Sequence, residues 1–493
     1  MQKTSVKTFD IKQSIVPLTV CVVFFLAILW QGAYFSVQYI FLLAVPFAAF
    51  ALYKRAVSIT LDALLLLGLV AVMLLSLVIK AKEPGIAFRE LLRYLLMPSY
   101  LLFFLAAKEK SHWYMKAFFA AIFTIALLGL LAYAGGIEIP SGIIQQSGRL
   151  QSTIQYANTT ALFMLIGILY SLHYFLTTKQ LRYPIYAVLF AFCLYITGSR
   201  TTLLLAFIIA IVYALTKMKR TSRFILLAVL FLSAIGLFVI GGRIVRVSLT
   251  EPTFIERVIT WQDGLIITAQ SPLFGLGIGN WQFEQFLYQS APYGVRYIHN
   301  YYIQLLMDGG VLSALLFIAV IANTLWRGRK ENSIHLFIIL AIVLHIFMDF
   351  DMSFGGIILI LMFSLSQMPD KGIFSVPCKK KPLRLFALVS ASILIFLWVS
   401  EFKYIVPDPL GEKFSKSEIQ AENKEYLPAI ENMEYLLQAW RFNESYQQFY
   451  ESLLIDAFEE GVISAEERQQ KLILMEESSA VVNSLYTKYI AGQ

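Results

Sequence analysis

Long apolar runs separated by short polar breaks make up the chain as far as residue 401, apart from one polar stretch at 242–300. Most runs extend over roughly 16–24 residues, about the length of helix that crosses the hydrocarbon core of a bilayer. The pattern predicts an all-α fold, a polytopic membrane helix bundle of about 12–13 transmembrane helices. The candidate spans lie near 15–30, 36–53, 58–79, 92–107, 115–136, 155–176, 183–198, 201–216, 224–241, 301–325, 334–350, 354–367 and 384–401. The pairs within 183–216 and 334–367 fit either two full spans each or broken helices.

Composition agrees with a membrane protein and removes other classes. The chain has 493 residues, of which 58% are hydrophobic and 15% charged, whereas soluble domains carry about 25% charged residues. Two of its three cysteines, Cys21 and Cys193, lie in candidate spans and Cys378 lies in a basic loop. No pair suggests a disulfide, and no Cys/His spacing suggests a metal site or another cofactor.

Two polar regions divide the chain into four parts. We expect N-terminal transmembrane helices at 1–241, an extracytoplasmic catalytic loop at 242–300, C-terminal transmembrane helices at 301–401 and an acidic helical tail at 402–493. The loop is rich in Gly and Arg and ends in His299-Asn300 where the next span begins. Such a loop holds ionisable groups at a membrane surface, which favours an enzyme that acts on a lipid-borne anionic substrate.

The distribution of Lys and Arg predicts the orientation. With a cytoplasmic N-terminus, thirteen spans place 22 Lys and Arg in inner connections and 10 in the outer breaks before residue 402. The positive-inside rule then places the 242–300 loop and the C-terminus outside. The net charge of +8 is therefore interpreted as a topology determinant and not as a nucleic-acid signal.

The outer basic residues between 137 and 300 are all Arg. A guanidinium grips phosphate oxygens two at a time and stays charged, which a Lys point charge does not match. Arg200 stands out because apolar residues follow it, where a charge is costly without a partner. It is either a ligand-binding group or a snorkelling Arg that closes a helical hairpin.

Within the loop, FIERVITWQDGLIITA predicts an amphipathic helix on the membrane surface, with Arg257 and Trp261 four residues apart on one face. The following SPLFGLGIGN has glycines at alternate positions, including Gly277, which form either an anion-binding nest or a plain turn. His299 closes the loop at the water–membrane boundary. It is either a general base or a structural histidine.

The tail at 402–493 holds 16 acidic and 8 basic residues. Its apolar periodicity predicts helices near 416–440, 443–459 and 464–490, with Gly461 as a stop and Ser464 and Glu467 as a capping box. The first two weakly resemble a tetratricopeptide helical pair. The tail is either a small helical cap on the membrane domain or a docking surface for an acceptor or protein partner.

Five ordered motifs between residues 145 and 365 resemble the O-antigen ligase and polymerase family of bacterial membrane glycosyltransferases. They are GRLQSTIQYANTTA (148–161), TGSRTTLLLA (197–206), ERVITWQDGLIITAQSPLFGLGIGNWQF (256–283), HNYYIQLLMDGGVLSALLF (299–317) and HIFMDFDMSFGG (345–356). The resemblance implies a multi-pass enzyme of the bacterial cytoplasmic membrane. It would transfer or polymerise glycan from an undecaprenyl-diphosphate carrier onto an acceptor hydroxyl of a glycan, lipid or protein, without metal or other cofactor and without nucleic acid.

The resemblance also assigns roles to residues. Arg200 and Arg257 would clamp the donor diphosphate, and His299 would take the acceptor proton. Supporting roles fall to further residues in or beside the motifs: Arg149, Asn158, Trp261, Gly277, Arg296, Asn300 and Asp349. Asp349, one turn after His345, would form a polar pair with it inside the bundle. The DFD at 349–351 is not interpreted as a metal site, because this donor class needs no metal.

Two other classes remain open on the sequence. A lipid-linked oligosaccharide flippase or polysaccharide exporter would also be polytopic and basic, but charges within spans are few (Asp62 is one) and no repeated halves are visible. A non-catalytic scaffold would recruit partners through the tail and would tolerate replacement of His299. The acidic outer tail departs from lipid A core ligases and favours a polymerase or ligase for a secreted or cell-wall polysaccharide.

Overall fold

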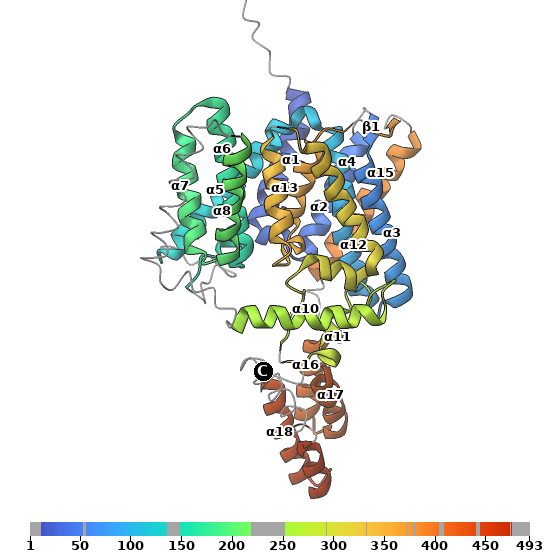
Figure 1. Ribbon diagram of the computed structural model, residues 1–493. Coiled ribbons are helices and arrows are strands. Elements are labelled where there is room, and N and C mark those ends of the chain that lie inside the picture. The colour runs from blue at the N-terminus through green and yellow to red at the C-terminus, as the bar shows by residue number, and fades with distance from the viewer. Residues whose placement is uncertain are drawn as a thin grey trace, which may run out of the picture. The chain divides into compact units, whose positions relative to one another are not determined.

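The computed structural model describes residues 11–52, 56–135, 148–217, 252–291, 293–331, 333–370, 372–377, 381–403, 409–439, 444–473 and 475. Over these residues the protein is helical apart from one short antiparallel strand pair, β1 (Ala56–Ile59) with β2 (Phe374–Pro377) (Figure 1). The sequence had not predicted these strands. The all-α polytopic membrane class is confirmed.

Every predicted span has a helix except 224–241, which lies outside the described residues. The apolar helices are α1 (Ile11–Leu29), α2 (Ser36–Leu52), α3 (Leu61–Lys80), α4 (Pro84–Ala106), α5 (Ser111–Tyr133), α6 (Ala157–Thr178), α7 (Arg182–Ile196), α8 (Arg200–Lys217), α12 (Tyr301–Gly328), α13 (Ile334–His345), α14 (Gly355–Ser366) and α15 (Lys381–Lys403). In the described part of the chain, four helical stretches are long and apolar enough to cross a membrane: Leu61–Lys80, Lys108–Tyr133, Ala157–Thr178 and Tyr301–Gly328.

Helix α4 begins eight residues before the predicted span at 92–107 and includes a charged segment. Glu90 and Arg93 form an ion pair at 2.8 Å and are only 4% and 5% exposed. The Arg93 guanidinium also lies over the ring of Tyr39, with 4.7 Å to the ring centroid. Because the two charges neutralise each other, the helix can continue through residues that hydropathy alone excludes.

The region 334–367 resolves into two short helices. Helices α13 and α14 have 12 residues each and pack against each other, joined through the 3₁₀ turn η4 (Asp351–Ser353). A 12-residue helix is about 18 Å long, shorter than the roughly 30 Å hydrocarbon core. The broken-helix alternative therefore describes this region, and its break carries buried acidic residues.

The chain divides into two compact units. Unit 1 comprises Met1–Leu74, Phe88–Arg246 and Leu315–Ser400, and holds most of the apolar helices. In it α1 packs on α5, while α13 packs on α6, α8 and α14. Unit 2 comprises Leu75–Ala87, Val247–Ala314 and Glu401–Gln493, which joins the polar loop and the tail.

The loop contributes α10 (Pro252–Gln270) and α11 (Trp281–Tyr288) to unit 2. The predicted amphipathic helix is thus confirmed as α10. Its buried face, with Ile255, Ile259 and Ile267, joins a core that includes Trp281 and Ile298. This core fixes α10 against the segment that ends at His299.

The tail forms α16 (Pro409–Glu422), α17 (Tyr426–Ala439), α18 (Glu444–Glu459) and a helical stretch at 465–473. The single helix predicted at 416–440 is wrong, because the chain turns at Lys424, whose φ is +62°. The predicted helix at 443–459 is confirmed, and so is the stop at Gly461, with φ +73°. The capping box is confirmed too, since Glu467 N–H donates to Ser464 Oγ at 3.1 Å and Ser464 N–H donates to Glu467 Oε2 at 2.8 Å.

The tail and the loop are in contact within unit 2, where α17 packs on α11. The tail also has its own apolar core, which includes Ile430, Met433, Leu436 and Leu454. Two regions that appear separate in the sequence therefore share one compact unit.

Two of the sequence motifs meet backbone to backbone in unit 2. Gly277 N–H donates to the Met307 carbonyl at 3.0 Å, and Val311 N–H donates to the Pro272 carbonyl at 2.9 Å. Gly275 (φ +64°) and Gly310 (φ +71°) lie where a Cβ would collide with backbone carbonyls of the opposite segment. The glycines of SPLFGLGIGN and MDGG are thus required by close approach and by left-handed backbone.

We predict that Gly275→Ala and Gly310→Ala each destabilise the protein by about 2 kcal/mol or more, because each combines a strained φ with a backbone clash. Gly68→Ala is the matched control, since its added Cβ would meet only Leu316 methyls at 3.7 Å and 3.8 Å. Thermal unfolding of the purified proteins checks this. Equal stability of all three variants would contradict the assigned role of the two glycines.

Candidate functional site

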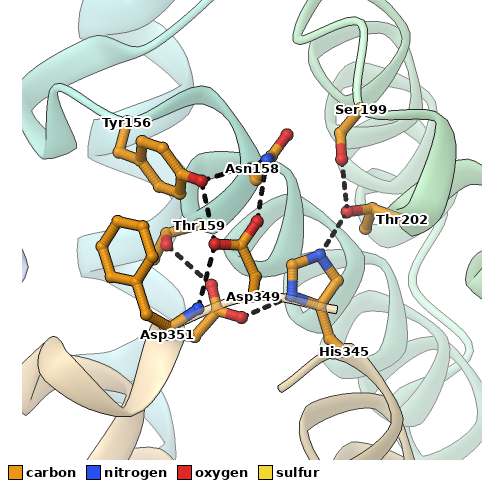
Figure 2. Close-up of polar contacts among 9 residues, drawn as sticks. Tyr156, Asn158, Thr159, Ser199, Thr202, His345, Asp349 and Asp351 are labelled. Atoms are coloured by element: carbon orange, nitrogen blue, oxygen red, sulfur yellow. Dashed lines mark hydrogen bonds and ion pairs between the residues drawn. The ribbon is translucent and has the colours of Figure 1, made fainter. Parts of the chain in front are cut away.

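A hydrogen-bonded group in unit 1 joins three of the sequence motifs, and Figure 2 shows its members Tyr156, Asn158 and Asp349. Arg149 donates through Nε to the Thr197 carbonyl at 2.7 Å and through a terminal nitrogen to Asn158 Oδ1 at 2.8 Å. Asn158 Nδ2 donates to Asp349 Oδ2 at 2.7 Å, and the Tyr156 hydroxyl donates to Asp349 Oδ1 at 2.8 Å. The predicted supporting residues Arg149, Asn158 and Asp349 therefore lie together.

A second buried group adjoins the start of α8. Asp351 accepts from Thr159 Oγ1 at 2.6 Å and meets His345 Nδ1 at 2.5 Å. His345 Nε2 lies 2.7 Å from Thr202 Oγ1, which lies 2.9 Å from Ser199 Oγ. The predicted pair of His345 with Asp349 is thus replaced by a pair with Asp351.

The reason for this change is the backbone between the two short helices. The predicted one-turn spacing assumes that α13 continues past His345, but the helix ends there and Asp351 begins the 3₁₀ turn. That turn brings the Asp351 carboxylate to the imidazole, while Asp349 accepts hydrogen bonds from Tyr156, just before α6, and from Asn158 in the first turn of α6. The pairing depends on the helix end, which hydropathy does not reveal.

Arg200 is the first residue of α8 and is half-buried. Gly198, with φ +62°, makes the turn that leads into the helix, and a Cβ there would lie 3.4 Å from Arg149 Nε. Ser199 and Thr202, on either side of Arg200, both belong to the buried group. The Arg200 backbone is therefore held by its neighbours, while its side chain remains partly exposed at the protein surface.

In unit 2, the residues assigned from the loop gather around α10. Arg257 and Trp261 lie one turn apart on this helix, and both are half-buried. Trp261 Nε1 donates to the His299 carbonyl at 3.0 Å. This bond ties the backbone of His299 to the helix that carries Arg257, and the His299 side chain is itself half-buried.

Asn300 has a structural role at the start of α12. Its Oδ1 accepts from Tyr302 N–H at 3.0 Å and from Ile303 N–H at 3.2 Å, as an N-cap does. The Gln304 side chain accepts from Ile298 N–H at 3.1 Å. These bonds from both sides of His299 set the direction in which the chain enters the helix.

Asp263 on α10 anchors the end of the loop. It is 3% exposed and accepts from Ser290 N–H at 2.9 Å, Ser290 Oγ at 2.8 Å and Tyr293 OH at 2.7 Å. Burial, reinforced by the Asp263 charge, raises the pKa of Tyr293 well above its ordinary value, so the phenol keeps its proton and donates. Asp263 was not predicted from the sequence, although it lies within the motif at 256–283.

The glycine turn does not present its amides as an anion nest. Gly275 N–H donates to Ser271 O at 2.7 Å, Gly277 N–H to Met307 O, and Gly279 N–H to Asp308 Oδ1 at 3.4 Å. The plain-turn interpretation therefore describes Gly277. Arg296 is exposed, with its guanidinium 5.5 Å from the centroid of the Tyr297 ring.

The predicted site residues thus fall into two groups, one in each unit. Unit 1 brings together Arg149, Asn158, Asp349 and the start of α8 with Arg200. Unit 2 brings together Arg257, Trp261, His299 and Asn300, while Gly277 belongs to the turn that docks on α12. Within the described residues, no group of three or more His, Cys, Asp or Glu could hold a metal ion.

Sequence reasoning missed several of the partners. They are Tyr156, Thr159, Ser199, Thr202, Asp263 and Asp351. All six lie within the family-like motifs of the sequence, so membership in a motif was the one sequence feature that could have indicated them. Hydroxyl and tyrosine side chains gave no pattern that distinguishes a network member from an ordinary helix residue.

We predict a pH-dependent stability effect at Glu256, next to Arg257. Burial raises the pKa of this carboxyl from its ordinary 4.5, although Arg257 opposes the shift. A raised folded-state pKa favours folding below the unfolded-state pKa, and this contribution is lost as pH rises through the folded-state value. The stability of Glu256→Gln should therefore equal that of the parent protein at pH 4. At pH 7 the variant should be more stable by up to about 1 kcal/mol, since solvent screens a half-buried group. Thermal unfolding from pH 4 to 7 checks this, and a gap that shrinks with pH would contradict it.

Comparison with known proteins adds one match. Residues 185–318 match the family model described as O-antigen ligase (Wzy_C). The matched stretch runs from α7 into α12 and includes Arg200, Arg257 and His299. No curated protein matches the chain. Together with its apolar helices, the match indicates a multi-pass membrane protein of glycosyltransferase type that is similar to the O-antigen ligase family over residues 185–318.

Proposed function

We propose that this protein transfers or polymerises glycan from an undecaprenyl-diphosphate carrier onto an acceptor hydroxyl at the outer face of the bacterial cytoplasmic membrane. The observation that carries the proposal is the family match over residues 185–318, which includes two half-buried arginines and a histidine tied to one of their helices. The proposal also places the N-terminus in the cytoplasm and the 242–300 loop and C-terminus outside.

Charge stabilisation is the first chemical requirement. The anomeric carbon–oxygen bond to the carrier breaks, and its electrons leave with the diphosphate. Arg200 and Arg257 supply guanidinium groups that pair with phosphate oxygens and stabilise the charge that develops there. Anchoring of Arg200 at the first residue of α8 and of Arg257 on α10 reduces the reorganisation needed in the transition state.

Activation of the acceptor is the second requirement. The acceptor hydroxyl attacks the anomeric carbon, and its proton passes to the imidazole of His299. The Trp261 bond to the His299 carbonyl and the Asn300 cap hold the backbone on both sides of this imidazole. Diphosphate is already a competent leaving group, so protonation of the carrier is not needed.

The remaining assignments follow from the contacts. Arg149, Asn158 and Asp349 are proposed to support the start of α8, which carries Arg200, through their hydrogen bonds to one another and to the Thr197 carbonyl. Trp261 offers a half-buried aromatic surface suited to a sugar ring. The acidic tail is proposed to serve as a docking surface for acceptor or protein partner, and membrane lipid surrounds the spans.

We predict that His299→Ala abolishes high-molecular-weight surface glycan, with lipid-linked units accumulating, because loss of a general base costs about 10²–10⁴-fold in rate. Arg257→Ala should act similarly, and Arg257→Lys should restore only part of the activity, since Lys cannot grip two phosphate oxygens. Glycan is measured on gels at matched protein levels in membranes.

The control is His112→Ala, which removes a histidine at the start of α5, outside the proposed site. It should leave the polymer unchanged. Normal polymer from His299→Ala would remove the catalytic assignment and favour a transport or scaffold function. Loss of polymer from both histidine variants would point to a general effect on the membrane domain.

A further inference from the structure

The first turn of α8 is held by a continuous chain of buried polar side chains. From Ser199 it passes through Thr202, His345 and Asp351 to Thr159 on α6, with contacts of 2.5–2.9 Å (Figure 2). Each member is at most 2% exposed. The chain links three helices and the 3₁₀ turn η4, and Arg200 lies in sequence between its first two members.

The order Thr202–His345–Asp351 has the geometry of a nucleophile, a base and an orienting carboxylate. Burial excludes that use. Thr202 is 0% exposed and its hydroxyl already contacts Ser199, so no substrate reaches it. The arrangement is instead a fixed connection between helices.

The chain of contacts favours one arrangement, because both polar atoms of its two central side chains, His345 and Asp351, have a partner. The two imidazole nitrogens of His345 face Thr202 and Asp351, and the two carboxylate oxygens of Asp351 face His345 and Thr159. A buried polar group that loses its partner costs free energy, so the arrangement in which every group keeps its partner is strongly favoured. Apolar side chains of similar volume would fill the same space without that orientation.

We propose that His345 and Asp351 are positioning residues that hold the first turn of α8 and so place Arg200 for the donor diphosphate. The inference rests on the proposed function, in which Arg200 binds that group. Through Thr202 the imidazole fixes the helix start, and through Asp351 it is itself fixed to η4 and α6. A small displacement of a charge-pairing group is enough to weaken binding and slow transfer.

The test compares Thr202→Val, which keeps the shape and removes the hydroxyl, with Thr202→Ser, which keeps the hydroxyl. Helix α13, which carries His345, also offers a matched control. Near its other end, His335 Nδ1 lies 3.4 Å from Ser364 Oγ. Ser364→Ala removes that buried His–hydroxyl contact without touching the connection to α8. Asp351→Asn provides a second variant of the connection itself.

Two quantities are measured on purified full-length protein in detergent. One is the dissociation constant of undecaprenyl diphosphate, and the other is amide hydrogen exchange at residues 200–203. We expect Thr202→Val and Asp351→Asn to weaken binding about tenfold and to speed exchange, as for loss of one buried hydrogen bond. Thr202→Ser should restore both quantities, and Ser364→Ala should leave both unchanged.

Arg200→Ala separates this inference from the proposed function. If Arg200→Ala weakens binding while Thr202→Val binds like the parent protein, the positioning role is overturned and the proposed function stands. If Arg200→Ala binds normally, the donor-binding role of Arg200 fails, and the positioning role for the donor fails with it. Equal losses in Thr202→Val and Ser364→Ala would also overturn it, because they would report general loosening.

Discussion

Burial of polar groups among apolar helices is the constraint on which this structure depends. A polar side chain inside such a bundle costs free energy unless it has a partner, so its position and its partner are fixed together. The same requirement explains the Glu90–Arg93 pair in α4 and the His345–Asp351 pair at the break between α13 and α14. In each case the helix departs from what hydropathy predicts, and a buried polar side chain with a polar partner allows it.

The polar loop obeys a different constraint, which is close approach of backbone. In unit 2 the glycine turn docks on the start of α12 so tightly that Gly275 and Gly310 have no room for a side chain. The Ser76 hydroxyl bridges the same region, donating to the Asp308 carbonyl at 2.5 Å and accepting from Ile278 N–H at 3.1 Å. This backbone contact adds to the apolar core around Trp281 and Ile298, which holds α10 against the segment before His299.

Much of the fold was predictable, because the length of an apolar run depends on the bilayer and is visible in sequence. The amphipathic α10, the Gly461 stop and the Ser464 capping box were also predicted, since each has a local pattern. The break at Lys424 was not, because its positive φ belongs to a residue with no turn signature. The short helices α13 and α14 were left as an alternative, since hydropathy measures burial and not where a helix ends.

The motifs that contribute to the candidate site were visible in the sequence, whereas the pairing of their residues was less so. The motifs contained the network residues, but their spacing suggested that His345 pairs with Asp349. Because α13 ends at His345, the imidazole pairs with Asp351 instead. The glycines allowed either an anion nest or a plain turn, and the plain turn is found, because their amides donate to backbone and Asp308 acceptors. Pairings between segments far apart in sequence depend on tertiary packing, which one sequence does not display.

Burial separates these motif residues into two kinds. Asn300 and Asp349 are at most 2% exposed and bind groups of the chain itself, so they hold its geometry. Arg200, Arg257 and His299 are half-buried, with their backbones held by neighbouring structure. A group that pairs with phosphate or takes a proton must be held in place and still reach the ligand, and these three combine both properties. The physical division therefore coincides with the division of roles in the proposed transfer reaction.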